Sequence, residues 1–503
     1  MVDAPQDSLE SDMAKANALY GDGALEQADR ACDALLTLQP DYGEALNLKG
    51  IVAFRNGQFE AAINFLIQAT KAPAARPNFF NNLGEVLRQN GSLDNAEQAL
   101  RNAVDMDPGY AVALNNLGVV LTDRGKIEEA FPVLKQALDR DGHYADAHNN
   151  LGTAYLGVGR YGDAEKCFQD AISNGPNKPE YCFNLGLVLE EQGDEDGALA
   201  AYQQSLSLDY RAEKAFENFC GILFGQDDAE SVRGLSLELQ SVGPELAYPY
   251  FYSGKAAVLL GDIAVARRDL ATYLERAPDD AHGAALLLAS QGEAPAPAQA
   301  NEAFLKKFYE RRAQGWDRFV TTNYHGHDII LERLKSDFGW PCPIKKLLDL
   351  GCGTGALGLE LRDKVGRLDG VDISPEMINR AEPKAIYDSL VLGDACDFLR
   401  SVEEPYTMVI AAAMLFHLRD LDEIFSLVAK ALAPGGGFVF TVFRTDNPDP
   451  ELNAYNLYLH SRPYLERTLE AAGFGEIVIS DHIHEYERKT IPRYCLAVSC
   501  RKV

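Results

Sequence analysis

The chain has no long apolar run. Nowhere in its 503 residues does an apolar stretch approach the roughly 18 residues of a membrane-spanning helix. Residues 1–10 are acidic and lack the apolar centre of a secretory signal, so we expect a cytoplasmic protein that does not bind a membrane. Its nine cysteines form no Cys-x-x-Cys pair, and no histidines stand at ligand spacing. This pattern argues against both a disulfide framework and a metal site.

Positive charge is also scarce. Lys and Arg number 47 against 75 Asp and Glu, which gives a net charge of −28, and most of the excess lies in residues 1–292. Because nucleic acid binding requires a basic surface that displaces counterions, we do not expect a nucleic acid partner. A neutral or basic partner suits the acidic half better.

What the sequence does contain is a 34-residue period across its first 280 residues. A small residue marks the period at Ala16, Gly50, Gly84, Gly118, Gly152, Gly186, Cys220 and Gly254. A glycine often follows seven residues later, and an alanine twelve residues later. This resembles the tetratricopeptide repeat, a helix-turn-helix unit whose stacked copies bury a shared core. The period predicts an α solenoid of about eight repeats with a closing helix over residues 9–292.

Asparagine recurs two residues before the marker residue. This row comprises Asn82, Asn116, Asn150, Asn184 and Asn218. In tetratricopeptide proteins the row lines the concave groove, and it resembles the asparagine ladder of O-linked N-acetylglucosamine transferase. Since an amide both donates and accepts, such a groove would bind the backbone of an extended protein or peptide segment. The alternative is that these side chains bond neighbouring helices.

The pattern changes after an Ala/Pro-rich segment, residues 293–300, which we expect to be a stiff linker. Residues 301–337 predict one or two amphipathic helices. Short apolar strands then alternate with helical stretches over residues 345–445, and Glu476–Ile479 and Tyr494–Ser499 form a closing antiparallel pair. We therefore expect residues 301–503 to form an α/β domain with a doubly wound, mostly parallel sheet.

A glycine loop follows the first of these strands. Gly353, Gly355 and Gly358 also fit a dinucleotide fingerprint, but Asp349 beside the turn would repel a pyrophosphate. It would instead attract an ammonium group. Asp372 ends the second strand, where an acid can accept both hydroxyls of a ribose, and Asp394 follows the third, placed to accept from an adenine amino group.

Together with the turn Pro434-Gly435-Gly436, this set resembles a class I S-adenosylmethionine-dependent methyltransferase with a Rossmann-like sheet. A bacterial group of such enzymes carries tetratricopeptide repeats and an aromatic-acid, alanine, aromatic-acid pattern, present here as Tyr309-Glu310, Ala313 and Trp316-Asp317. The resemblance implies S-adenosylmethionine as cofactor. Its implied binding residues are Asp349, Gly351, Cys352, Gly353, Gly355, Asp372, Ile373, Met377, Asp394, Ala395, Ala412 and Trp316. We interpret Cys352 as a small loop residue rather than a nucleophile.

Three side chains are candidates for acceptor chemistry. His417 follows the fourth strand, and His460 and Tyr464 follow the fifth, so all three are expected at carboxyl ends of strands. A general base is needed only if the acceptor must lose a proton. For each the alternative is a packing or surface role.

The sequence therefore predicts an enzyme that methylates an acceptor recruited by the repeat groove, most simply a protein or peptide segment. A small-metabolite acceptor, with the repeats as an assembly platform, is a second interpretation. A third is a non-enzymatic scaffold that retains a cofactor-binding domain.

Overall fold

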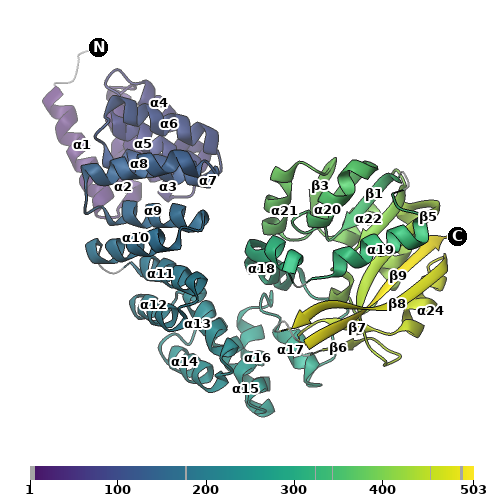
Figure 1. Cartoon of the computed structure of the whole chain (residues 1–503). Coiled ribbons are helices and arrows are strands. Elements are labelled where there is room, and N and C mark those ends of the chain that lie inside the picture. Colours follow the sequence, from purple (N-terminus) through teal and green to yellow (C-terminus); the bar gives the residue numbers. More distant parts are fainter. Residues whose placement is uncertain (1–5, 176–177, 323, 342–343, 454, 488–490) are drawn as a thin grey trace. The chain divides into compact units, whose positions relative to one another are not determined.

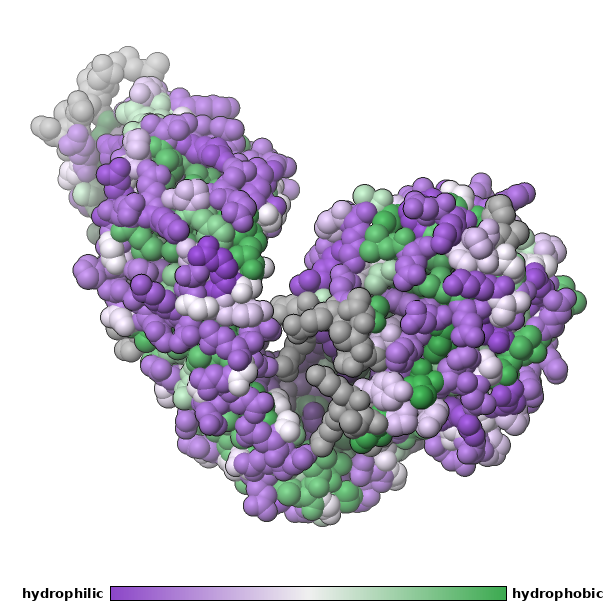
Figure 2. Space-filling model, in the orientation of Figure 1, coloured by the Kyte–Doolittle hydropathy of each residue, from purple (hydrophilic) through white to green (hydrophobic). Residues whose placement is uncertain are grey.

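The computed structural model describes residues 6–175, 178–322, 324–341, 344–453, 455–487 and 491–503 (Figure 1). The chain divides into two compact units, Met1–Gln226 and Asp227–Val503. None of the described helices is long and apolar enough to cross a membrane. Hydrophilic residues cover most of the face shown in Figure 2.

The first unit consists of antiparallel helix pairs, as the 34-residue period predicts. Its helices are α1 (Gln6–Gly21), α2 (Leu25–Leu38), α3 (Gly43–Arg55), α4 (Phe59–Lys71), α5 (Pro77–Gln89), α6 (Leu93–Met106), α7 (Ala111–Asp123), α8 (Ile127–Arg140), α9 (Ala145–Gly157), α10 (Tyr161–Asn174), α11 (Pro179–Gln192), α12 (Glu195–Leu208) and α13 (Glu213–Gly225). Each helix buries an apolar stripe against its neighbours, so no pair has a core of its own.

The recurring small residues are explained by close helix contact. A methyl group at Gly118 on α7 would lie 2.4 Å from Leu134 Cγ on α8, and Ala130 on α8 is fully buried. The glycine seven residues later makes the turn between the two helices, since Gly125 has φ 72°. In the seventh repeat Asp227 takes this left-handed position with φ 59°.

The second unit begins with the last repeats. These are α14 (Ala229–Val242), α15 (Tyr248–Leu259), α16 (Ile263–Arg276) and the closing helix α17 (Ala284–Ser290). Asp280 stabilises the N-terminus of α17, because its carboxylate accepts from the backbone N–H groups of Ala284 and Ala285, at 2.6 and 3.0 Å.

A mostly parallel sheet follows, preceded by α18 (Glu302–Thr322) and α19 (Gly326–Phe338). Its strands are β1 (Ile344–Leu350), β2 (Val365–Asp372), β3 (Ser389–Leu392), β4 (Tyr406–Ala411), β5 (Leu432–Arg444), β6 (Glu451–Leu452), β7 (Tyr458–His460), β8 (Phe474–Glu487) and β9 (Ile491–Lys502). The order β3-β2-β1-β4-β5 is parallel throughout, and β9 then pairs antiparallel with β5 and with β8. This is the doubly wound sheet with a closing antiparallel pair that the sequence predicts.

Helices alternate with the strands along the chain and pack on the sheet. They are α20 (Ala356–Leu361), α21 (Pro375–Ala381), α22 (Ala395–Arg400), α23 (Asp422–Ala431) and α24 (Arg462–Ala471). The main core lies between β4, β5, β9 and the helices α22, α23 and α24.

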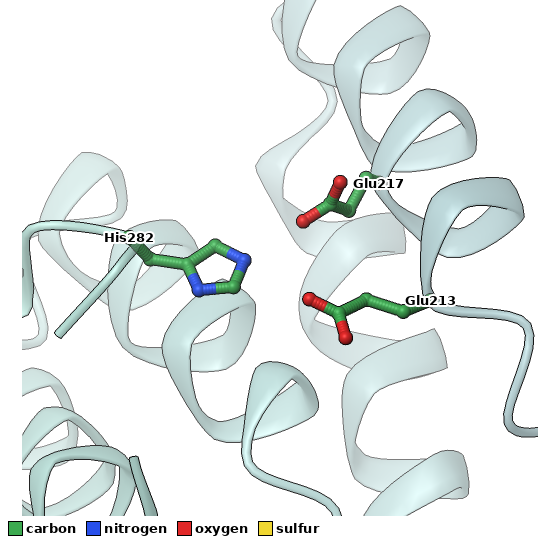
Figure 3. Close-up of side chains that lie close together, drawn as sticks. All are labelled: Glu213, Glu217 and His282. Carbon is green, nitrogen blue, oxygen red and sulfur yellow. The ribbon is translucent and has the colours of Figure 1, made fainter. Parts of the chain in front are cut away.

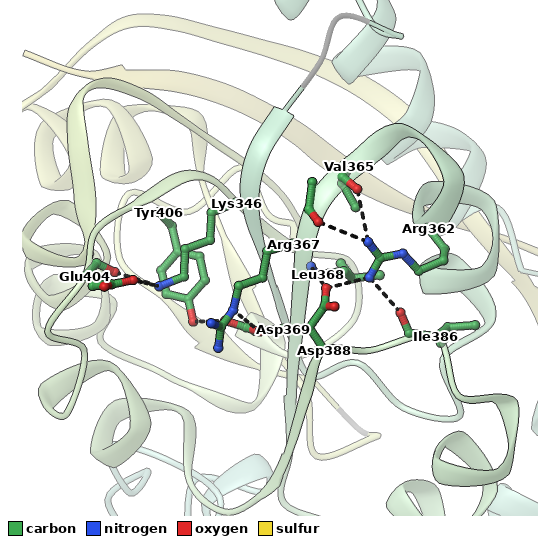
Figure 4. A network of polar contacts seen from close by, with 11 residues as sticks. Lys346, Arg362, Val365, Arg367, Leu368, Asp369, Ile386, Asp388, Glu404 and Tyr406 are labelled. Atoms are coloured by element: carbon green, nitrogen blue, oxygen red, sulfur yellow. Dashed lines mark hydrogen bonds and ion pairs between the residues drawn. The ribbon is translucent and has the colours of Figure 1, made fainter.

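Polar side chains brace the strands at the β2 side of the sheet (Figure 4). Asp369 on β2 is buried and accepts from Tyr406 Oη at 2.8 Å and from Arg367 Nε at 2.9 Å. Asp388 before β3 accepts from Arg362 and from the backbone N–H of Leu368. These bonds satisfy buried polar groups between strands, while parallel pairing brings the carboxyl ends of β1 to β4 to one edge of the sheet.

Candidate functional site

A cavity of about 360 Å³ opens at the carboxyl ends of β1, β2, β3 and β4. Among the described residues its lining includes these predicted cofactor ligands: Asp349, Gly351, Cys352, Gly353, Asp372, Ile373, Met377, Asp394, Ala395, Ala412 and Trp316. Gly355 is not among the described lining residues. It stands at the N-terminus of α20 with φ 80° and packs against Ile386 and Tyr387. The parallel sheet thus brings together side chains from four separate stretches of sequence.

Asp349 is a buried acid that contacts no basic side chain among the described residues. It is 2% exposed, and its Oδ2 accepts from Tyr387 Oη at 2.9 Å. Burial raises the pKa of Asp349 to about 7; the Tyr387 hydrogen bond opposes this shift and the charge of Asp372 adds to it. Because the ionised form is costly here, the site favours a ligand that brings positive charge.

Asp372 ties the glycine loop to β2. Its Oδ2 accepts from the backbone N–H of Gly353 at 2.8 Å, and its Oδ1 accepts from that of Ser374 at 2.9 Å. Burial raises the pKa of Asp372, and these N–H groups oppose the rise. Each oxygen keeps a lone pair for a ligand hydroxyl.

Asp394 begins the next helix. Its Oδ1 accepts from the N–H groups of Cys396 and Asp397 at the start of α22. Both bonds use Oδ1, so among the contacts described Oδ2 is available to a ligand.

Helix α18 covers the cavity, and the aromatic-acid pattern explains how. Tyr309 and Trp316 line the cavity, while Ala313 between them is buried. A Cβ at Gly353 would lie 3.5 Å from Trp316 Nε1, so the indole rests on the glycine loop. Asp317 accepts from the Thr354 hydroxyl and from Lys384 Nζ, the latter at 2.9 Å, and so latches α18 to the loop and to the segment after α21.

The segment expected to be a linker forms another wall. The backbone N–H of Ala300 donates to the His417 carbonyl at 2.9 Å, and the N–H of Arg419 donates to the Ala298 carbonyl at 2.8 Å. Gln299 and Ala300 line the cavity. We call residues 297–300, bonded in this way to the loop after β4, the strap.

The strap follows the closing helix of the repeats after a short connection, residues 291–296. Leu286 on α17 packs with Ala300, Phe304 and Tyr458 in one buried cluster. Asn301 Nδ2 donates to the Asp280 carbonyl at 3.3 Å, and its Oδ1 accepts from the N–H of Phe304. The end of the repeats therefore packs on the α/β fold within the second unit.

Of the three acceptor candidates, His417 lines the cavity and is 4% exposed. Burial, with the nearby Arg312 charge, lowers the pKa of His417 to about 3. A neutral imidazole this weakly basic is a poor general base but still accepts or donates hydrogen bonds.

His460 and Tyr464 lie elsewhere. His460 is 0% exposed, and its Nε2 bonds the Arg419 carbonyl at 3.1 Å. Tyr464 Oη accepts from the N–H of Leu421 at 2.8 Å. Neither is among the described lining residues. Both side chains instead bond backbone groups of the loop of residues 418–421. Their only route to an effect on the acceptor is the position of that loop.

Sequence reasoning missed two parts of the site. Tyr309 belongs to the aromatic-acid pattern, yet the pattern did not show that it faces the cavity together with His417. The strap gave no side-chain signal, because it binds through its backbone.

The repeat asparagines form a hydrogen-bonded series in the first unit. Four amides of the row donate to an asparagine of the repeat before: Asn82 to Asn47 at 3.0 Å, Asn116 to Asn81 at 3.0 Å, Asn150 to Asn115 at 2.8 Å and Asn184 to Asn149 at 2.9 Å. Asn218 donates instead to Tyr202 Oη at 3.1 Å. These side chains therefore do bond neighbouring helices, which is the alternative role that the sequence left open.

The partners Asn81, Asn115 and Asn149 form a second row, one residue before the first, and the series ends where this second row changes. Phe183 and Glu217 stand at the positions that hold asparagine in the earlier repeats. Glu213 and Glu217 lie one turn apart on α13 (Figure 3). The amide surface therefore belongs chiefly to α5, α7, α9 and α11.

Comparison with known families agrees with this division of the chain. A methyltransferase domain model matches residues 347–436. Tetratricopeptide repeat models match residues 76–142 and 109–177, and also 13–78 and 149–213.

Curated relatives match the methyltransferase region. Nodulation protein S of Rhizobium tropici is 34% identical over 21% of this chain and 46% of its own length. A ubiquinone biosynthesis O-methyltransferase of Hydrogenovibrio crunogenus is 33% identical over 19% of this chain and 42% of its own length. A malonyl-[acyl-carrier protein] O-methyltransferase of Geobacter sulfurreducens is 27% identical over 39% of this chain and 78% of its own length. The chain spans less than half the length of the first two relatives.

The fold and the cavity define the class of this protein: an array of tetratricopeptide repeats followed by a class I methyltransferase domain. A domain of this class implies S-adenosylmethionine as its cofactor.

Proposed function

We propose that this chain is an S-adenosylmethionine-dependent methyltransferase whose repeat groove recruits the acceptor, a protein or peptide segment. The observation that carries the methyltransferase assignment is the convergence of Asp349, Asp372 and Asp394 on one cavity at the carboxyl ends of β1, β2 and β3. We also propose that the solenoid extends over residues 9–292 and the methyltransferase domain over residues 301–503.

The residues of the cavity suit the cofactor. Asp349 would hold the ammonium of the methionine tail, which would relieve the cost of its buried charge. Asp372 would accept from the ribose hydroxyls, and Asp394 from the adenine amino group. The glycine loop lets the backbone approach the ligand beneath Trp316.

When bound, S-adenosylmethionine supplies a methyl group already activated by its sulfonium. The chain's own task is then alignment and exclusion of water. Helix α18, latched by Asp317, and the strap cover two sides of the cavity.

The groove supports a protein or peptide acceptor. Each asparagine of the first row donates one N–H to the repeat before it. The amide nitrogen has a second N–H, which would donate to a bound backbone carbonyl. The bonds between repeats hold these amides in fixed orientation, which lowers the entropy cost of binding a backbone.

A small-metabolite acceptor is the second candidate. It is favoured by the relatives, which include a ubiquinone biosynthesis O-methyltransferase. A non-enzymatic scaffold would bind the cofactor without turnover.

The test is transfer from methyl-tritiated S-adenosylmethionine by the purified chain in an extract of its own cells. Label in a discrete protein band would support recruitment and deliver the acceptor. Label confined to the small-molecule fraction would support the metabolite candidate. Cofactor binding without label in either fraction would count against the enzyme assignment.

A further inference from the structure

The sheet order places the acceptor on the β4 side of the cavity. Asp394 follows β3, Asp372 is the last residue of β2 and Asp349 lies near the end of β1, and these strands are neighbours in that order. In the proposed function the cofactor therefore runs from β3 to β1, with its methionine end nearest β4. An acceptor must approach that end, where the residues following β4 line the cavity.

Tyr309 and His417 meet on this side. His417 follows β4, and its Nε2 lies 2.8 Å from the hydroxyl of Tyr309 on α18. The Tyr309 ring packs edge-to-face on His417, with ring centroids 5.7 Å apart, and on Trp316 at 6.2 Å. The other imidazole nitrogen, Nδ1, is buried and has no hydrogen-bond partner among the described residues.

Such a pair has a defined hydrogen-bonding capacity. Burial raises the pKa of Tyr309, so its hydroxyl keeps its hydrogen, and His417 is neutral. If Nε2 accepts that hydrogen, the tyrosine oxygen offers only lone pairs to the cavity and Nδ1 carries an unpaired N–H.

We propose that Tyr309, oriented by His417, positions the methyl acceptor by accepting a hydrogen bond from its hydroxyl or amine. The inference rests on the proposed function. Tyr309 contacts the acceptor, and His417 is a positioning residue behind it. An acceptor whose hydrogen points to Tyr309 keeps its lone pair free to face the methyl group.

The pair also selects the chemical class of the acceptor. A hydroxyl or an amine has a hydrogen to donate to the tyrosine oxygen, whereas a carboxylate has none and would meet a lone pair. We therefore expect an acceptor that carries a hydrogen on the atom to be methylated, unlike a malonyl carboxylate.

Sinefungin tests this without knowledge of the acceptor. This analogue carries an amine where S-adenosylmethionine carries its transferable methyl, so its N–H groups probe the acceptor position. The dissociation constants of sinefungin and of S-adenosylhomocysteine are measured by calorimetry on the full chain. Tyr309→Phe should weaken sinefungin about tenfold, the loss expected for a hydrogen bond to a charged donor, and leave S-adenosylhomocysteine within about twofold.

Three further variants separate positioning from packing. His417→Leu should weaken sinefungin selectively, and His417→Gln, whose amide oxygen can accept the tyrosine hydrogen, should recover part of the loss. Tyr406→Phe is the matched control, because it removes a buried hydroxyl that bonds Asp369 away from the cavity. It should change neither affinity.

Equal losses of both ligands in Tyr309→Phe would make Tyr309 a cofactor residue and overturn the proposal. Unchanged affinities for both ligands would reduce the pair to packing and would also overturn it. If neither ligand bound the unaltered chain, the cofactor site itself would fail, and with it the proposed function.

Discussion

At the scale of single residues, the cavity is organised by acids whose charge is costly until a ligand arrives. Asp349 shows this most clearly, because burial raises its pKa to about 7 in the free protein. Pairing with an ammonium favours the ionised form, so the pKa falls in the complex. Binding and ionisation of Asp349 are therefore linked.

This linkage predicts pH-dependent cofactor binding. Above pH about 7 Asp349 is already ionised and affinity should be level. Below that pH the free protein is protonated, binding must release a proton, and the dissociation constant of S-adenosylhomocysteine should rise about tenfold per pH unit. Calorimetry from pH 5.5 to 8.5 in buffers of different ionisation enthalpy measures both the affinity and the proton release.

Asp349→Asn is the control for this prediction. It keeps the shape of the side chain and removes the ionisation, so affinity should be weaker and independent of pH across the same range. A wild-type affinity with no change between pH 5.5 and 8.5 would contradict the role given to Asp349.

The orientation of single side chains could be predicted only in part from the sequence. The rule that ligands bind at carboxyl ends of parallel strands placed His417, His460 and Tyr464 at the correct edge of the sheet. It could not tell which side chains face the cavity, because that depends on rotamers and on the loop of residues 418–421. The structure has His417 facing inward, while His460 and Tyr464 support the loop.

At the scale of elements, α18 and the strap turn an open sheet edge into a covered cavity. The sequence predicted helices over residues 301–337, since their apolar residues repeat at helical spacing. It predicted a stiff linker over residues 293–300, and there the structure adds contacts that no side-chain pattern encodes. The strap is bonded through the carbonyl of Ala298, which any residue could supply, and through the N–H of Ala300, which any residue except proline could supply.

That exception gives a test of the strap. Ala300→Pro removes the N–H that donates to the His417 carbonyl and leaves that carbonyl unpaired, a cost of about 1–3 kcal/mol. Because Gln299 and Ala300 form a cavity wall, we expect S-adenosylhomocysteine to bind several-fold to tenfold more weakly. Ala298→Pro is the matched variant: Ala298 is exposed and contributes its carbonyl, which proline retains.

Thermal unfolding of both proline variants separates a local effect from misfolding. A weaker affinity in Ala300→Pro with an unfolding midpoint close to that of Ala298→Pro would support the strap as part of the site. Equal affinities in the two variants would show that the cavity does not depend on it.

At the scale of the whole molecule, the repeat period predicted the helix pairs but not the division between the two units. The period fixes helix lengths and turns, because the small residues permit close packing at every repeat. The division falls after Gln226, within the seventh repeat, where Cys220 and Asp227 replace the usual glycines. The last repeats join the second unit because α17 packs on Phe304 and Tyr458, a tertiary contact that the sequence pattern does not contain.

The hypothesis that the repeat groove recruits the acceptor concerns the whole molecule. It predicts that substitutions can separate acceptor recruitment from cofactor binding. Replacing Asn116 and Asn150 by alanine removes two groove amides without touching the cavity. Cofactor affinity should stay within about twofold, while label transferred to the protein acceptor should fall at least tenfold, as expected for the loss of two hydrogen bonds of about 1 kcal/mol each. The measurement combines calorimetry with tritium counting of the labelled band.

The same substitutions also remove bonds between repeats, since Asn116 donates to Asn81 and Asn150 to Asn115. Some loss of stability, about 1 kcal/mol per bond, is therefore expected and must be separated from lost recruitment. Gln98→Ala with Asn102→Ala is the control, because this amide pair, 3.1 Å apart, lies on α6 outside the asparagine rows. The control should keep its labelling. If the groove variant also kept full labelling while its unfolding midpoint fell, the asparagines would serve only to join the repeats, and a small-metabolite acceptor would become the better account.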